Sequence, residues 1–245
     1  MQQPHLKKTI NKSKFLSIIP ARIGSKGIPK KNLFPLHKKP LIEWTIEASL
    51  NSKYIDKTIV SSDSNEILNL DSNLNFCKHK RSKKLSNDLA RSEDVVLSIL
   101  NEDTSLKNYE YIILLQPTSP LRTASHIDKA CAKIIKNKTD SLMTVKEISN
   151  EVLKTFIDDG KNGLRAGFDK EFPFMPRQKL PKAYMPNGAI YIVKTKSFTK
   201  NKFFMSKQNS FMVMDDNSSI DIDSLLDIRH AEKVSKNILR DIHLK

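Results

Sequence analysis

Residues 18–32 combine glycines with several cations in a segment that follows a short apolar run. The sequence there reads IIPARIGSKGIPKKN, and its glycine spacing matches neither a Walker A loop nor a dinucleotide fingerprint. The glycines allow a tight turn and a close approach of the backbone to a ligand, while the cations add positive charge beside unpaired N–H groups. The segment predicts a phosphate-binding loop, and the plainer alternative is a surface turn in a lysine-rich chain. Its glycines are Gly24 and Gly27, and its cations are Arg22, Lys26, Lys30 and Lys31.

Two aspartates stand two positions apart near the end of the sequence, in residues 219–223 (SIDID). In an extended segment, side chains at positions i and i+2 point to the same side. Mg²⁺ commonly binds one or two carboxylates and takes its remaining ligands from water and substrate phosphates. We therefore expect Asp221 and Asp223 to bind Mg²⁺. The alternative, in which acids complement the dipole of the following helix, explains Asp223 better than Asp221.

Two further polar segments border apolar runs. Residues 116–122 (QPTSPLR) follow an apolar run, and their two prolines stiffen a loop that presents Gln116, whose amide can both donate and accept hydrogen bonds. Residues 186–188 (PNG) precede the apolar residues 189–191 and predict a hairpin turn that leads into a strand. Either segment, taken alone, is explained by a stiff turn.

Apolar runs of strand length alternate with segments whose apolar residues recur at helical spacing. Such alternation predicts an α/β fold with a mainly parallel, twisted sheet and helices on its faces. In sheets of this kind, ligands bind where the loops at the carboxyl ends of the strands converge, so residues 22–32, 61–63 and 116–122 should meet at one edge. The expected strands are 15–21, 58–61, a short one near 76, 111–116, 142–145, 188–193 and 211–214, and the expected helices are 42–50, 95–100, 127–135 and 225–239.

The length of 245 residues suits one domain that buries roughly 70–75% of its unfolded surface. After about residue 148 the alternation stops, and residues 151–185 contain prolines and lysines without clean periodicity. We therefore expect a single domain over residues 1–245, with an inserted arm at approximately 148–187.

The net charge of +15 comes from 42 Lys and Arg residues against 27 Asp and Glu residues. Such a charge admits a nucleic-acid or anionic-membrane surface. The lysines are scattered, however, and their densest cluster, residues 78–84, contains no Phe, Tyr or Trp on which bases could stack. We interpret most of the charge as a solvated surface and do not expect nucleic acid to be the main partner.

Cys77 and Cys131 match no metal-ligand spacing, and we expect both to be buried in a reducing compartment. No apolar run approaches about 18 residues, and residues 1–14 are polar and basic. The sequence thus predicts neither a membrane span nor a signal peptide, and we expect a cytoplasmic protein.

Six segments together resemble the acylneuraminate cytidylyltransferases, also called CMP-sialic acid synthetases. They occur in the family's order and extend over nearly the whole chain. The resemblance implies a nucleotide-diphospho-sugar transferase-like, Rossmann-like fold and an enzyme that joins CMP from CTP to the anomeric hydroxyl of a nine-carbon 2-keto sugar acid, releasing pyrophosphate with Mg²⁺ as cofactor. The matching segments are residues 18–32, 81–92, 116–122, 177–178, 186–191 and 220–223.

The resemblance also implies a role for each matching position. It implies catalytic roles for Lys31, Arg177 and Asp223, and metal binding by Asp221 and Asp223. It further implies a homodimer in which the inserted arm crosses to the other subunit. The implied nucleotide-binding residues are Arg22, Ser25, Lys26, Lys31, Asn32, Arg81, Ala90 and Ser92, and the implied sugar-binding residues are Gln116, Arg177, Asn187, Tyr191, Phe203 and Phe204, the two phenylalanines from the neighbouring subunit.

Two positions depart from the family pattern. Ile23 stands where the loop often has a small or polar residue, and Ser82 stands where a proline is usual. The substrate alternatives are legionaminic or pseudaminic acid and, more remotely, a 3-deoxy-octulosonate. The general base stays open between a metal-bound hydroxide and an aspartate acting through water. Outside this chemistry, the chain could be a basic nucleic-acid-binding module or an inactive partner subunit, although the presence of Lys31, Arg177 and Asp223 argues against lost activity.

Overall fold

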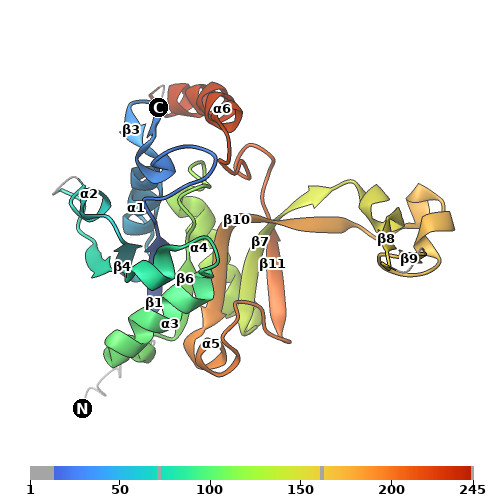
Figure 1. Ribbon diagram of the computed structural model, residues 1–245, viewed down its shortest axis with the longest axis horizontal. Helices are drawn as coiled ribbons and strands as arrows, with labels where there is room; N and C mark the ends of the chain where they lie inside the picture. The colour runs from blue at the N-terminus through green and yellow to red at the C-terminus, as the bar shows by residue number, and fades with distance from the viewer. Residues whose placement is uncertain (1–13, 71–72, 161–162, 244–245) are drawn as a thin grey trace, which may run out of the picture.

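The computed structural model describes residues 14–70, 73–160 and 163–243, and for 236–243 the course of the backbone alone. Residues 1–13, which carry most of the polar segment that we do not expect to be a signal peptide, lie outside this description. The chain forms a central sheet flanked by helices, with an arm that projects from one side (Figure 1). This arrangement confirms the predicted α/β fold.

Seven strands form the central sheet in the order β11-β7-β10-β6-β1-β4-β5. β10 runs antiparallel to its neighbours β6 and β7, whereas the other pairs are parallel. β10 is reversed because it returns from the arm alongside β7, which leads into it. The strands are β1 (Phe15–Pro20), β4 (Ile55–Ser62), β5 (Cys77–Lys80), β6 (Tyr111–Leu114), β7 (Ser141–Ile148), β10 (Ala183–Lys194) and β11 (Asn209–Val213).

Helices cover both faces of the sheet, and each helix that the sequence predicts is present. Along β1, Phe15 and Ile19 pack into a core with α1 and α4, while Leu16 and Ile18 pack into a second core with α3 and α5. Alternate residues of a strand point to opposite faces, so a strand covered on both sides reads as a continuous apolar run. The helices are α1 (Leu41–Leu50), α2 (Asn65–Leu68), α3 (Ser92–Glu102), α4 (Ala124–Asn137), α5 (Thr195–Asn201) and α6 (Leu225–His243).

The two cysteines differ in their surroundings. Cys131 is buried on α4, as expected, but Cys77 is exposed. The expectation for Cys77 is wrong because this residue begins β5, the edge strand of the sheet. In the part of the chain that is described, no helix is long and apolar enough to cross a membrane.

The Pro-Asn-Gly segment is an irregularity inside β10 rather than the expected turn before a strand. Pro186 pairs with Val145 of β7, and the register between the two strands shifts between Pro186 and Tyr191. Gly188 adopts a φ of 74°, which a glycine reaches without steric cost. The strand therefore begins at Ala183, five positions before the predicted start, and the Pro-Asn-Gly sequence forms a bulge.

Residues 149–182 form the arm between β7 and β10, and it extends away from the sheet (Figure 1). None of the described residues of its short hairpin is buried, and the hairpin carries the exposed apolar side chains Phe156, Ile157 and Leu164, followed along the arm by Phe168 and Phe174. The absence of one buried face explains why this stretch shows no clean periodicity. The arm contains η4 (Asn150–Lys154), β8 (Phe156–Asp158), β9 (Leu164–Ala166), η5 (Phe172–Phe174) and η6 (Arg177–Lys179).

A third apolar cluster lies outside the sheet and joins segments that are distant in sequence. We call residues 22–32 the glycine loop and residues 219–223 the acidic segment. In this cluster, Ile28 of the glycine loop and Leu121 of the loop after β6 pack against Ile220 and Ile222 of the acidic segment, and α6 completes the cluster. The remaining short elements are η1 (Lys31–Leu33), β2 (Pro35–Leu36), β3 (Lys39–Pro40), η2 (Lys83–Ser86) and η3 (Thr104–Asn108).

Arg122 is the largest fully buried side chain and connects three parts of the fold. Its Nε donates to Ala189 O at 3.1 Å, and its Nη2 donates to Thr45 Oγ1 at 2.9 Å and to Gln116 O at 3.0 Å. Burial lowers the pKa of Arg122 to about 9, which leaves the guanidinium charged at neutral pH. Its hydrogen bonds fix β10 and α1 relative to the loop that follows β6.

Candidate active site

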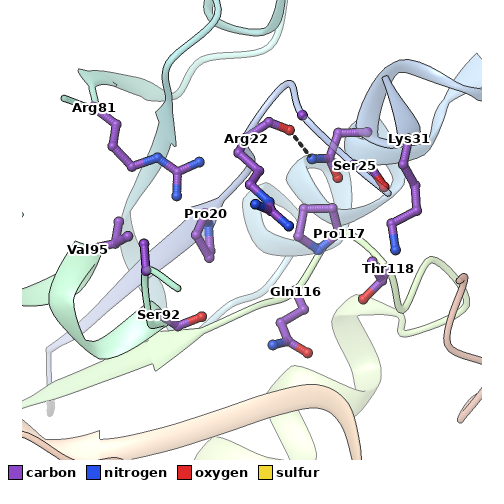
Figure 2. A pocket seen from close by; sticks show the side chains of 13 residues that line it. Pro20, Arg22, Ser25, Lys31, Arg81, Ser92, Val95, Gln116, Pro117 and Thr118 are labelled. Carbon is purple, nitrogen blue, oxygen red and sulfur yellow. Dashed lines mark hydrogen bonds between the residues drawn. The ribbon is translucent and has the colours of Figure 1, made fainter. Parts of the chain in front are cut away.

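A pocket of about 210 Å³ opens at the carboxyl ends of β1 and β6 (Figure 2). After β1 the chain adds β4 and β5 on one side of β1, and it then crosses to add β6 on the other side. Such a switch in strand order leaves a crevice in which a ligand can bind. We call this the first pocket. Most of the predicted nucleotide residues line it, namely Arg22, Ser25, Lys31, Asn32, Arg81, Ala90 and Ser92, together with Gln116, Pro117 and Thr118.

The glycine loop is held at both ends by hydrogen bonds. At its start, Ile23 N donates to Asp63 Oδ1 at 2.9 Å, which ties the loop to the end of β4. At its end, Asn32 Nδ2 donates to Arg22 O at 2.8 Å, the dashed line in Figure 2. The Asn32 side chain thus holds the end of the loop against its start.

Asp88 forms ion pairs with two cations of the glycine loop, and the sequence analysis did not predict these contacts. Arg22 Nη1 lies 2.5 Å from Asp88 Oδ1, and Lys26 Nζ lies 3.1 Å from Asp88 Oδ2. Hydrogen bonds from Arg22 and Lys26 hold the pKa of Asp88 below its usual value. Lys26, whose side chain is 80% exposed, is not among the residues that line the first pocket. Two cations that share one carboxylate are also suited to a phosphate.

Arg81 is buried with unused donors. The residue is 6% exposed, and its Nε and Nη2 find no hydrogen-bond partner within the described ranges. Desolvation lowers the pKa of Arg81, and the charge of Asp63 opposes that change. Figure 2 shows the guanidinium directed into the first pocket. Because a buried N–H without an acceptor is costly, these atoms favour a ligand with carbonyl or ring-nitrogen acceptors.

Lys31 connects the glycine loop to the acidic segment. Its Nζ donates to Ile222 O at 2.7 Å and to Asp223 Oδ1 at 2.9 Å. The same two segments also touch through Gly27, where a Cβ atom would come within 2.3 Å of Asp223 O. Glycine is therefore required at position 27 because the two backbones meet there.

The two aspartates of the acidic segment lie on the same side of the chain, since both are exposed and Ile222 between them is buried. Burial on one side raises the pKa of the Asp221 carboxyl, and the charge of Asp223 adds to the rise. Two neighbouring carboxylates that disfavour each other's charge fit a divalent cation. No group of three or more His, Cys, Asp or Glu side chains in the described chain is arranged to hold a metal, so an ion here would need further oxygens from a substrate or water.

Asp227, rather than Asp223, serves the start of α6. Its Oδ2 accepts hydrogen bonds from Asp223 N at 3.1 Å and from Ser224 N at 2.7 Å. Free N–H groups at a helix start are satisfied by such acceptors. Asp227 therefore provides these hydrogen bonds at the helix start, while the Asp223 side chain, which is 79% exposed, contacts Lys31.

A second pocket of about 360 Å³ shares Ser92 and Gln116 with the first. Gly188 permits the close approach of β10, because a Cβ there would lie 2.8 Å from Gln116 Oε1 and 3.9 Å from Asp221 Oδ1. The predicted sugar-binding residues Tyr191, Phe203 and Phe204 line this pocket within one chain. The second pocket is lined by Ser92, Glu93, Leu114, Gln116, Met143, Pro186, Tyr191, Phe203, Phe204 and Met205.

Two of the predicted sugar-binding residues do not line either pocket. The Asn187 amide is buried and occupied, because Nδ2 donates to Ser219 Oγ at 2.9 Å and Oδ1 accepts from Thr144 Oγ1 at 2.7 Å. The Asn187 side chain therefore stabilises the bulge of β10 and does not line the second pocket. Arg177 lies on the arm, where its Nη1 is 3.3 Å from Glu151 Oε1. Spacing in the sequence carries no signal for either location.

Comparisons with known proteins show the family to which the chain is similar. A cytidylyltransferase family model matches residues 16–221. The chain is 33% identical over 227 residues to a pseudaminic acid cytidylyltransferase of Campylobacter jejuni, with 91% of this chain and 97% of that protein covered. It is 32% identical to an N-acylneuraminate cytidylyltransferase of Escherichia coli, with 90% and 52% covered, and 32% identical to a CMP-N,N'-diacetyllegionaminic acid synthase of Legionella pneumophila, with 90% and 96% covered.

A solved structure titled CMP:2-keto-3-deoxy-manno-octonic acid synthetase complexed with CTP shares the fold. Its TM-score with this chain is 0.66 at 13% sequence identity, with 92% of this chain and 99% of that chain covered. At this identity the likeness establishes the architecture alone.

The contact between Gly27 and Asp223 yields a prediction with a matched control. Gly27→Ala should lower the free energy of unfolding by about 1–3 kcal/mol, because the new methyl group displaces backbone that cannot yield. Gly24→Ala, where a Cβ meets nothing within 4 Å, should leave it unchanged or raise it by up to about 1 kcal/mol. Urea denaturation measures both, and equal effects would refute the proposed backbone contact.

Proposed function

The chain belongs to the cytidylyltransferase family, and from this premise we propose that it transfers CMP from CTP to the anomeric hydroxyl of a nonulosonic acid, releasing pyrophosphate. The observation that carries this proposal is the first pocket, where the buried guanidinium of Arg81 has unused donors, and where Figure 2 shows Lys31 on the far side from Arg81 with Arg22 between them. A nucleotide with an acceptor-rich base and a triphosphate matches both ends.

The residues of the first pocket have complementary roles in this proposal. The Nε and Nη2 donors of Arg81 would bind the carbonyl oxygen and ring nitrogen of cytosine, with Ala90 and Ser92 beside them. Arg22, Ser25 and Lys31 would hold the phosphates, and Lys26 would join them when a phosphate replaces Asp88. Charge-assisted contacts of this kind bind phosphates strongly.

The reaction needs positioning and charge neutralisation more than a covalent nucleophile. The anomeric hydroxyl of the sugar acid loses its proton to a general base as its oxygen forms a bond to the α-phosphorus, and the bond from that phosphorus to the bridging oxygen of the leaving pyrophosphate breaks. The leaving pyrophosphate gains negative charge next to Lys31, whose side chain is 14% exposed and held in place by two hydrogen bonds. Electrostatic stabilisation is strong at such a partly buried cation.

Asp221 and Asp223 would hold Mg²⁺, because they present two carboxylates on one side of the acidic segment next to the first pocket. When bound, the ion supplies positive charge to the phosphate oxygens of the substrate. Lys31 would keep Asp223 oriented through the contact at 2.9 Å.

The sugar acid would lie in the second pocket, next to Gln116 and Tyr191. We propose a sialic-type acid, with legionaminic or pseudaminic acid as the alternative substrates. The three curated relatives act, by their names, on different members of this class, and their identities of 32–33% do not separate them.

We further propose a homodimer formed through the arm. The arm carries exposed Phe156, Leu164 and Phe174 on short elements without a core, and such a surface suits burial against a second copy. Arg177 lies on the arm and lines neither pocket of its own chain. Through dimer formation it would reach the site of the partner subunit and bind the sugar carboxylate.

Product analysis tests the function directly. The protein with CTP, Mg²⁺ and N-acetylneuraminic, legionaminic or pseudaminic acid should release pyrophosphate and form a CMP-sugar, detected by coupled assay and mass spectrometry.

Arg81→Met should raise the KM for CTP about 10-fold or more without lowering the melting temperature, because it removes donors that lack partners. Lys83→Met, at an exposed neighbouring position, should change neither quantity.

Absence of pyrophosphate release by the wild-type protein with every acid, combined with salt-sensitive binding of nucleic acid, would instead support the alternative of a basic nucleic-acid-binding module.

The metal assignment predicts a large effect at Asp223. Asp223→Asn should reduce Mg²⁺-dependent turnover about 100-fold or more, because one anionic ligand is lost while the exposed position tolerates the change. Asp216→Asn, in the exposed turn before the acidic segment, is the control and should retain the normal rate. A Mg²⁺ titration of pyrophosphate release distinguishes the variants, and a near-normal rate for Asp223→Asn would exclude this residue as a ligand.

The shared site can be tested by complementation. Arg177→Ala and Asp223→Asn homodimers should both be nearly inactive, but a heterodimer of the two, isolated through two affinity tags, should regain about half of the wild-type activity, since one of its two sites is complete. No recovery in the isolated heterodimer would place Arg177 in the site of its own chain, and a monomer in sedimentation at micromolar concentration would refute the dimer.

A further inference from the structure

Two cations of the glycine loop are held by an anion of the chain itself, the carboxylate of Asp88. Its Oδ1 lies 2.5 Å from Arg22 Nη1 and its Oδ2 lies 3.1 Å from Lys26 Nζ, so each oxygen contacts one cation. Arg22 lines the first pocket, where Figure 2 shows it between Arg81 and Lys31. Asp88 therefore engages the same two cations to which the proposed function assigns a phosphate.

The segment that carries Asp88, residues 82–90, is weakly attached to the rest of the described chain. None of its residues is buried, and Leu85 is half-buried against the core that contains α3. Apart from the contacts of Asp88, the hydrogen bonds that the structure shows for this segment stay within it, as from Asn87 Nδ2 to Lys84 O at 2.8 Å. A segment with few buried contacts moves at little cost in free energy.

Stability does not account for the contacts of Asp88. The Asp88 side chain is 43% exposed and that of Lys26 is 80% exposed, and ion pairs between exposed side chains contribute little to the free energy of folding. Water can satisfy the donors of both cations at such a site. The main effect of the carboxylate is instead electrostatic, because it reduces the positive charge that an incoming anion meets.

A phosphate from solution must compete with Asp88 for these cations. Two anions at one pair of cations repel each other, so a bound phosphate and the contacts of Asp88 disfavour one another. Every ligand that uses Arg22 and Lys26 binds to the fraction of molecules in which Asp88 has left them, and its affinity is reduced by that fraction. The reduction is therefore the same factor for each such ligand. A tethered carboxylate competes at an effective concentration on the order of millimolar.

We infer that Asp88 is a resident competitor of phosphate groups, which occupies Arg22 and Lys26 in the free protein, leaves them when CTP binds, and by its return weakens the binding of the leaving pyrophosphate. This inference rests on the proposed function and adds a residue that sets the affinity of the first pocket for phosphates. Slow release of a tightly bound product limits the turnover of many enzymes. A competitor within the chain counteracts that limit.

Binding of phosphate ligands to Asp88→Asn tests the inference. The substitution keeps the size of the side chain and removes its charge. The affinities for CTP, inorganic pyrophosphate and inorganic tripolyphosphate should each rise about 3- to 10-fold over wild type, and by a similar factor. Isothermal titration calorimetry at low ionic strength, without a sugar acid, measures them. The affinity for cytidine, which carries no phosphate, should stay within about 2-fold of wild type.

Glu66→Gln is the matched control. Glu66 Oε2 lies 2.7 Å from Nζ of Lys30, another cation of the glycine loop, and both side chains are more than half exposed. The substitution removes the same charge from an ion pair of the same loop, but Lys30 does not line the first pocket. Each affinity should therefore stay within about 2-fold of wild type.

Two results would overturn the inference. The first is an Asp88→Asn protein that binds the phosphate ligands no more tightly than wild type, as expected if Asp88 only orients the two cations. The second is an equal gain in Glu66→Gln or for cytidine, which would assign the effect to net charge. Failure of the wild-type protein to release pyrophosphate from CTP with any sugar acid would instead overturn the proposed function, because the gain in tripolyphosphate affinity does not depend on that reaction.

Discussion

The buried guanidinium of Arg122 is the constraint on which the site depends. Within the described part of the chain no carboxylate pairs with it, and its hydrogen bonds go to neutral acceptors on β10, on α1 and at Gln116. A buried charge is tolerated only where such hydrogen bonds compensate its desolvation. The three segments cannot separate without exposing this charge to an apolar interior. As a result, the carboxyl end of β6 and the bulge of β10 are held at one distance, and both pockets share the wall between them.

Backbone contacts fix the other half of the site. The glycine loop and the acidic segment are almost 200 positions apart in sequence, yet Gly27 meets Asp223 directly and Lys31 donates to two atoms of the acidic segment. The apolar cluster beneath them, which includes Ile28, Ile220 and Ile222, provides the burial that brings these polar segments together. Cations and carboxylates are thereby placed side by side on a rigid base, as an electrostatically organised site requires.

The two pockets present opposite chemistry across a shared wall. The first combines cations with the unused donors of Arg81, whereas the second is apolar apart from Glu93 and a few polar groups. Each buried charge lowers stability unless a ligand compensates it, and conflicts of this kind between stability and local environment are expected at functional sites. A substrate that brings phosphates and neutral acceptors would compensate the cations and the unused donors of the first pocket.

The sequence alone located the seven strands of the sheet and the four longest helices and indicated types of chemistry, because periodicity and residue type are local properties. The alternating runs located the strands and helices, and the glycines, lysines and aspartates indicated phosphate and metal binding. Tertiary structure decided which residues are free to act. It occupies the Asn187 amide with Ser219 and Thr144, engages Lys26 with Asp88, and places Arg177 on the arm and Glu93 in a pocket wall. These outcomes depend on neighbours that only packing brings together, and spacing along the chain does not encode them.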